Sequence, residues 1–352
     1  MIKKIQNTKF WLLGWSFMSC VLGFTSICYA QEITILYTGE THAMLYQCSC
    51  PVEQDGGVAR RATLIKQLRK DNPGTLLVDI GRFFAGGLLD EYTLNTELDL
   101  ERARVNLKAM ELMKYDAVAI SDDEFNFGEA ALRQNLERTN LAFLSCNISA
   151  DNSEKKPKAL SPYIIKEVSG TKIGIIGVTS PSARQKAAGL NIIEPKAAVK
   201  EAVKALKEQQ VPLIILLSNL DEAQSADLIK ENPEINVLVI GRRHTQENHF
   251  GQIGSTLVLK SSWQGRQLGK AWLLLKDNKI VTYKVDELRI SNKIADAPEI
   301  LSVLPACFSD INCKKEALLG TCQEPGALKS RCIFSQPAKI SLLVILPKVC
   351  KV

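Results

Sequence analysis

The chain has 352 residues, of which 46% are apolar and 23% are charged, as is ordinary for a soluble globular protein of one or two domains. Its formal charge is +6, but residues 1–30 hold three lysines and no acidic residue, so 41 basic residues face 38 acidic ones in the rest of the chain. This balance gives no sign of a basic patch, and we expect no nucleic-acid partner.

Residues 1–30 have the features of a secretory signal peptide. Two lysines precede an apolar stretch from Phe10 to Phe24, and Cys28-Tyr29-Ala30 is an acceptable cleavage site. No later stretch reaches the ~20 apolar residues that a membrane span needs, so we expect an exported protein, periplasmic or extracellular, with no span after cleavage. Two alternatives stay open: a lipoprotein acylated at Cys20, although Phe17-Met18-Ser19 is a poor recognition sequence, and an uncleaved anchor.

From residue 31 to residue 290, strand-like runs alternate with stretches of helical spacing. Several of the runs are continuously apolar, as in strands buried on both faces. They are Ile33–Thr38, Thr75–Ile80, Ala117–Ile120, Phe143–Ile148, Lys172–Thr179, Leu213–Ser218 and Val237–Ile240, followed by a more antiparallel set, Thr256–Lys260, Trp272–Leu275 and Ile280–Val285. Helical spacing recurs over Val58–Leu68, Leu107–Met113, Ala198–Leu206 and Ala223–Ile229. The alternation predicts a layered α/β domain over residues 31–290.

The composition changes beyond this domain. Residues 291–305 have the pattern of a linker with a short helix, and residues 306–333 form a polar segment with little apolar content. In an oxidising compartment its cysteines are expected to form disulfides rather than to bind zinc, and the three possible pairings stay open; they are Cys307, Cys313, Cys322 and Cys332. Residues 334–352 contain the strand-like run Ile340–Leu346 and end shortly after Cys350.

Six short segments carry motif-like combinations of glycine, acidic and histidine residues; they are Tyr37–Ala43, Gly56–Arg61, Val78–Arg82, Ser121–Gly128, Leu217–Leu220 and Gly241–Thr245. In this order they resemble the motifs T-N-D-x-H-G, G-G-x-A-R, D-x-G-D, G-N-H-E-F-D-x-G, S-H-x-G and G-H-S-H-T of the periplasmic 5′-nucleotidase and UDP-sugar hydrolase family of calcineurin-like metallophosphoesterases. The resemblance covers about residues 32–288. It implies a two-sheet α/β sandwich of the metallophosphoesterase type, here followed by a small disulfide-rich module.

The resemblance also implies where two metal ions would bind, and most of those positions have changed. The corresponding residues are Glu40, His42, Arg82, Asp122, Asn219, Arg242 and His244, of which only the two histidines keep the residue type of the family. Arginine stays protonated and cannot bind a metal ion, and Arg82 takes the place of the carboxylate that bridges both metals. Asp123 replaces the histidine that stabilises the transition state, and Asn126 replaces its carboxylate partner. No intact catalytic group remains.

Three interpretations of this site stay open. In the first, Arg82 and Arg242 neutralise the acidic residues Glu40, Asp122 and Asp123 in a structural ion cluster. In the second, the arginines bind an oxyanion. In the third, one divalent metal is held by Glu40, His42, Asp122 and His244, and the chain is a phosphoric-ester hydrolase with a reduced site. We expect no cofactor, or at most one divalent metal, and an exported 5′-nucleotidase-like protein that is not a phosphatase.

The cysteines suggest a different chemistry, thiol or selenol redox exchange with an unknown small molecule or redox partner. Cys48 and Cys50 form a C-x-C pair in the loop that leaves the first strand, where the alternative is a structural bond within the pair or to Cys146. Ile340–Leu346 and Cys350 are similar to the first strand and the first cysteine of a thioredoxin-like domain. The chain also resembles a group of bacterial selenoproteins with a degenerate nucleotidase-like domain, which suggests truncation at a selenocysteine UGA codon.

Overall fold

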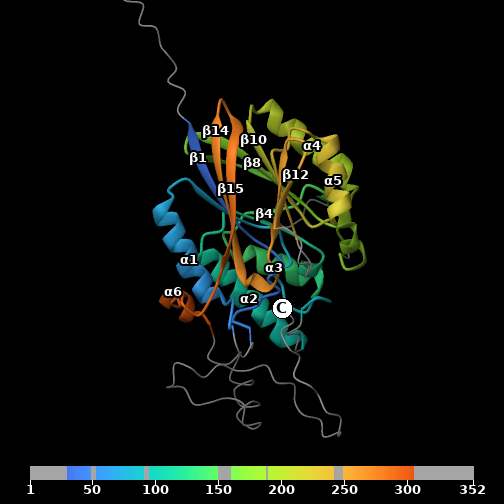
Figure 1. The fold of residues 1–352 in the computed structure, drawn as a ribbon. Coiled ribbons are helices and arrows are strands. Elements are labelled where there is room, and N and C mark those ends of the chain that lie inside the picture. The colour runs from blue at the N-terminus through green and yellow to red at the C-terminus, as the bar shows by residue number, and fades with distance from the viewer. Residues whose placement is uncertain are drawn as a thin grey trace, which may run out of the picture.

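Two β-sheets stack face to face, and helices cover their outer faces (Figure 1). The computed structural model describes residues 30–48, 53–90, 95–149, 160–187, 189–241 and 249–304. The signal peptide, the cysteine-rich module and the residues around Cys350 therefore lie outside the described residues, as do Cys50, Arg242 and His244. In the described part of the chain, no helix is long and apolar enough to cross a membrane.

The first sheet has the strand order β15-β14-β1-β2-β3-β4-β6. Its strands are β1 (Gln31–Thr38), β2 (Thr75–Asp79), β3 (Ala117–Ala119), β4 (Phe143–Leu144), β6 (Leu160–Ser161), β14 (Gln267–Lys276) and β15 (Lys279–Arg289). From β1 to β6 the neighbours are parallel, and β14 joins β1 in antiparallel register before it turns back as β15. The carboxyl ends of the parallel strands therefore point to the same edge.

The second sheet has the order β12-β13-β11-β10-β8-β7. Its strands are β7 (Tyr163–Val168), β8 (Thr171–Val178), β10 (Leu213–Ser218), β11 (Val237–Gly241), β12 (Phe250–Ile253) and β13 (Thr256–Ser261). The four central strands β8, β10, β11 and β13 are parallel, and β7 and β12 are antiparallel edges. β5 (Ile148–Ser149) and β9 (Asn191–Ile192) pair in antiparallel register and form a separate two-stranded sheet.

Three apolar clusters hold these layers together. The middle one joins the inner faces of both sheets, through side chains such as Ile35 and Ile215. The other two join each sheet to its helices: α1 (Val58–Asp71), α2 (Thr96–Leu112), α3 (Glu129–Glu137) and α6 (Pro298–Leu301) on the first sheet, and α4 (Pro195–Glu208) and α5 (Glu222–Glu231) on the second. This confirms the predicted two-sheet α/β sandwich, because strands that are apolar on both faces need a layer on each side.

The structure corrects one predicted strand. The run Phe143–Ile148 was expected to be continuous, but it divides into β4 and β5. The polar side chains between them bond elsewhere: the Ser145 hydroxyl lies 2.8 Å from the Thr179 hydroxyl, and the Asn147 amide donates to the Thr179 carbonyl at 2.8 Å. Cys146, which lies within that predicted run, is therefore a partly buried residue between two strands.

The predicted linker carries α6, which packs on α1. The Ala297 amide donates to the Ala59 carbonyl at 3.1 Å, and Ile300 is fully buried in the cluster beneath the first sheet. The other helices begin and end close to the predicted ranges, except that α2 starts eleven residues before the predicted Leu107 and α3 was not predicted.

Candidate functional site

The candidate site lies where the carboxyl ends of both sheets meet. Glu40 and His42 follow β1, Arg82 follows β2, Asp122 follows β3 and Asn219 follows β10. The sheets are joined there by the Ile120 carbonyl, which accepts hydrogen bonds from Thr179 at 2.6 Å and from Asn219 at 3.2 Å. Ligands of open α/β sheets gather at this edge, so the fold brings five of the seven predicted metal positions to the place where a ligand would bind.

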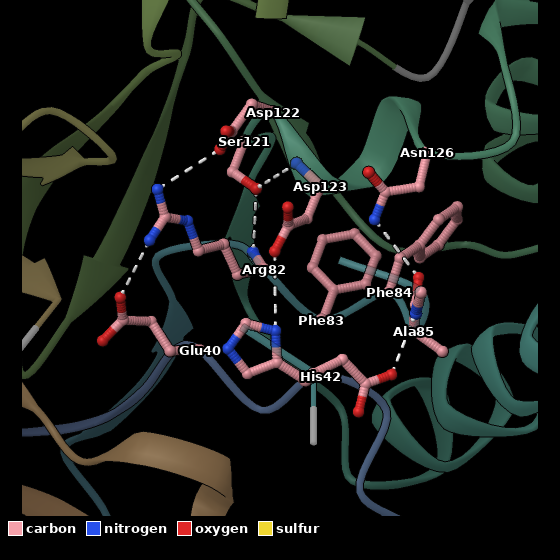
Figure 2. Close-up of polar contacts among 12 residues, drawn as sticks. Glu40, His42, Arg82, Phe83, Phe84, Ala85, Ser121, Asp122, Asp123 and Asn126 are labelled. Carbon is pink, nitrogen blue, oxygen red and sulfur yellow. Dashed lines mark hydrogen bonds and ion pairs between the residues drawn. The ribbon is translucent and has the colours of Figure 1, made fainter. Parts of the chain in front are cut away.

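Arg82 lies between two carboxylates at the centre of the site. Its guanidinium donates to Glu40 Oε1 at 3.1 Å and to Asp122 Oδ1 at 3.3 Å, as Figure 2 shows. The side chain of Glu40 is 1% exposed and that of Arg82 is 8% exposed, so this pair is shielded from solvent. Burial alone would lower the pKa of the guanidinium, but the charges of Asp122 and Glu40 outweigh burial and raise it.

The backbone of the site is held in a conformation that these residue types rarely adopt. Glu40 has a φ of 52°, His42 of 47° and Arg82 of 58°. Two hydrogen bonds join these loops: the Glu40 amide donates to the Gly81 carbonyl at 2.9 Å, and the His42 amide donates to the Arg82 carbonyl at 2.8 Å. Asp and Asn accept positive φ more easily than Arg does, so the local conformation suits a carboxylate at position 82 better than the arginine that occupies it.

Glu124 fixes the loop that carries Arg82. Its carboxylate accepts hydrogen bonds from the amides of Arg82, Phe83 and Phe84 at 3.2, 2.8 and 3.1 Å. It also accepts from the amide of Ser121 at 2.7 Å and from its hydroxyl at 2.5 Å. Burial raises the pKa of Glu124 to about 7, because these hydrogen bonds only partly offset the loss of water. Both oxygen atoms of the Glu124 carboxylate thus accept hydrogen bonds from backbone amides, and one also accepts from the Ser121 hydroxyl.

Asp79 gives similar support at the end of β2. It accepts from the Thr38 hydroxyl at 2.5 Å and from the Gly81 amide at 2.7 Å, and burial raises its pKa to about 6. Neither Asp79 nor Glu124 was singled out as a functional residue by the sequence. Both occupy acidic positions of the D-x-G-D and G-N-H-E-F-D-x-G motifs, which is the signal by which they could have been recognised.

A buried arginine holds the loop that carries His42. Arg102 is 1% exposed, and its guanidinium lies 2.9 Å from both Asp90 Oδ2 and Asp99 Oδ1. It also donates to the backbone carbonyls of His42 at 3.0 Å and of Ala43 at 3.4 Å. Arg102 therefore neutralises two buried carboxylates and at the same time fixes the backbone beside the site.

His42, Asp123, Lys186 and Asn126 form a second group beside Arg82. The His42 Nδ1 atom lies 3.5 Å from Asp123 Oδ2, and the Lys186 ammonium lies 3.9 Å from Asp123 Oδ1 (Figure 2 shows the first pair). Burial would raise the pKa of Asp123, but the nearby imidazole of His42, with the charges of Arg82 and Lys186, outweighs it and lowers that pKa. Lys186 was not predicted to be part of the site, because it lies in a polar segment after β8 with no motif-like pattern.

These residues do not fit a centre of two metal ions. The carboxylates that would grip the metals, Glu40 and Asp122, are bonded to a permanent cation that cannot be a ligand. Asn219 Oδ1 and the ring nitrogens of His42 have no hydrogen-bond partner among the described residues, but these neutral atoms do not supply the carboxylates that a two-metal centre needs. In the described part of the chain, no group of three or more His, Cys, Asp or Glu side chains could hold a metal ion. Arg242 and His244 lie outside it, although Gly241 before them is packed against the Glu40 carboxylate.

The described cysteines are both free thiols. Cys48 is buried, and its thiol donates to the Glu53 carbonyl at 3.2 Å. Burial raises the pKa of the Cys146 thiol to about 12. The suggested bond between Cys48 and Cys146 is therefore not formed, and the pairing of Cys48 with Cys50 lies outside the described residues.

Comparisons with known proteins identify relatives by both sequence and structure. A trifunctional nucleotide phosphoesterase of Bacillus subtilis is 25% identical over 71% of this chain and 18% of its own length. A 5′-nucleotidase of Vibrio cholerae is 31% identical over 56% of this chain and 35% of its own length. The chain thus spans well under half of these relatives. No family model matches it.

Two solved structures show the same fold. A 5′-nucleotidase precursor from Thermus thermophilus superposes with a TM-score of 0.68 at 21% identity, covering 82% of this chain and 59% of the other. A calcineurin-like phosphoesterase from Bacillus subtilis superposes with a TM-score of 0.64 at 22% identity, covering 78% of this chain and 96% of the other.

Proposed function

We propose that the chain is an exported member of the 5′-nucleotidase-like metallophosphoesterase superfamily that has exchanged its metal centre for an ion cluster and does not hydrolyse phosphoesters. The observation that carries this proposal is the position of Arg82, whose guanidinium bonds both Glu40 and Asp122. A cation built into the chain occupies the carboxylates that a catalytic metal would need.

The chemistry of hydrolysis supports the same conclusion. Metallophosphoesterases generate a hydroxide from metal-bound water and stabilise the charge that develops on the phosphate. A guanidinium offers hydrogen bonds to an anion, but it neither binds water as a Lewis acid nor accepts a proton. Asp123 occupies the position of the histidine that stabilises the transition state in the family. Its carboxylate would repel the negative charge that develops on the phosphate, so it would destabilise the transition state.

The test is a hydrolysis assay on the purified chain with Mn²⁺, Zn²⁺ or Co²⁺, using nucleoside monophosphates and UDP-sugars. The related 5′-nucleotidase of Vibrio cholerae, assayed in parallel, is the positive control. We expect no turnover above background and no bound metal by elemental analysis. Metal-dependent turnover near or above ~1 s⁻¹, which is the low end of typical enzymes, would refute the proposal if His42→Ala abolished it.

We also propose a thiol redox role for Cys48 and Cys50. It is supported by the C-x-C pair, whose loop has a well-defined base: the Cys48 amide donates to the Asp55 carbonyl at 2.8 Å, and Arg289 bonds Glu53 and Asp55. Peptide mapping without reductant, after alkylation of the exported protein, tests it. A Cys48–Cys50 bond that dithiothreitol opens easily would support redox function, while permanently reduced thiols would count against it.

A further inference from the structure

We propose that, among the described residues, Lys186 is a second cation of this site beside Arg82, and that Lys186 and Arg82 together exclude divalent cations from its three carboxylates. The inference rests on the proposed loss of the metal centre. Lys186 lies outside the six motif-like segments.

The site contains three carboxylates whose negative charge must be balanced. The side chains of Glu40, Asp122 and Asp123 are 1%, 17% and 8% exposed. Buried carboxylates need cationic partners, since isolated charges are costly away from water. Arg82 forms ion pairs with the first two. Asp123 lies within 4 Å of Lys186, and of His42, which is charged only when protonated.

The position of Lys186 is defined by a second contact. Its ammonium donates to Asn126 Oδ1 at 2.7 Å, and the amide of Asn126 in turn donates to the Ala85 carbonyl at 3.3 Å. This second bond orients the amide so that its oxygen faces the lysine. A carboxylate at position 126 would add a fourth acidic group, whereas the neutral amide holds the ammonium near Asp123 without changing the charge.

Lys186 and Arg82 reach the site from different sheets. Lys186 follows the short helix η2 (Pro181–Gln185) after β8 of the second sheet, while Arg82 follows β2 of the first sheet. The Lys186 side chain is 39% exposed, against 8% for Arg82. Arg82 is thus the inner cation, and Lys186 lies where the site meets solvent.

This arrangement predicts what happens when the cations are removed. Replacing Arg82 by Asp supplies a further carboxylate to a group that already contains Glu40 and Asp122, and such oxygen-rich sets bind divalent cations. Lys186 would still repel the incoming ion. Removing Lys186 as well should strengthen binding about tenfold, a modest factor because the ammonium is partly screened by solvent.

The experiment measures Mn²⁺ binding to the full chain by calorimetry. We compare the wild type, Lys186→Met, Arg82→Asp and Arg82→Asp/Lys186→Met. The matched control is Arg82→Asp/Lys200→Met, since Lys200 is an exposed lysine of α4. We expect no millimolar-range binding by the wild type or Lys186→Met, binding by Arg82→Asp, and about tenfold tighter binding only when Lys186 is also removed.

Equal affinities for the two double variants would overturn the role of Lys186. Binding and hydrolysis by the wild type would instead refute the proposed function, so the two failures are distinguishable. If Arg82→Asp does not fold, as judged by circular dichroism, the same series is measured with Arg82→Gln, which removes the charge without adding one. The same ratio between its double variants is then expected, and equal affinities again refute the inference.

Discussion

Replacing Arg82 by methionine tests whether the central ion pair stabilises the fold. The change removes the guanidinium but keeps most of the apolar stem, so it leaves the Glu40 carboxylate, which is 1% exposed, without this partner. Breaking a buried ion pair by removing one member costs roughly 3–5 kcal/mol. The pair with Asp122 adds little, because that carboxylate is 17% exposed and better solvated. We therefore expect a loss of about 3 kcal/mol in the free energy of unfolding.

The assay is urea unfolding of the full chain at pH 7.5, followed by circular dichroism. Arg82→Met/Glu40→Gln should recover most of the loss, since the buried charge is removed together with its partner. Arg104→Met is the control, because Arg104 and Glu101 form an exposed pair on one helix and should contribute less than about 1 kcal/mol. A loss in Arg82→Met no larger than this control, or no recovery in the double variant, would refute the reasoning.

Two further predictions use the shifted pKa values. Asp79 has its pKa raised by burial from an ordinary 3.8 to about 6, so its contribution to stability is present in acid and is lost as the pH rises through 6. The stability of Asp79→Asn relative to wild type should therefore increase by roughly 2 kcal/mol between pH 4 and pH 7, and a flat difference in urea unfolding would contradict this. Cys146, with a pKa of about 12, should resist iodoacetamide at pH 8 in the folded protein, as peptide mass spectrometry can show; labelling as fast as in urea would disprove it.

The central strands were predictable because burial on both faces leaves a continuous apolar run. Leu213–Ser218 was predicted with its observed bounds. Half-buried elements were harder: β7 has only partly buried and exposed residues, and α3 is a nine-residue helix with just three buried side chains. In both, charged residues interrupt the apolar ones, so no continuous apolar run marks the element.

The meeting of Glu40, Arg82 and Asp122 could be expected from the resemblance, because their motifs end neighbouring parallel strands. Lys186 could not be expected, since a lysine in a polar segment resembles any solvated lysine. Its hydrogen bond with Asn126 depends on how the second sheet packs on the first, and the spacing between the two sheets cannot be inferred from a single sequence.

The residues that hold the loops of the site, Arg102 and Glu124, bond the main chain of those loops and not the side chains of Glu40, Arg82 and Asp122. Arg102 bonds the carbonyls of residues 42 and 43, and Glu124 bonds the amides of residues 82 to 84. The loops thus keep their course whichever side chains they carry, and substitutions at the centre can accumulate in evolution without collapsing the fold. Such a scaffold tolerates the loss of one chemistry and leaves the polar end of the sheets open to selection for another.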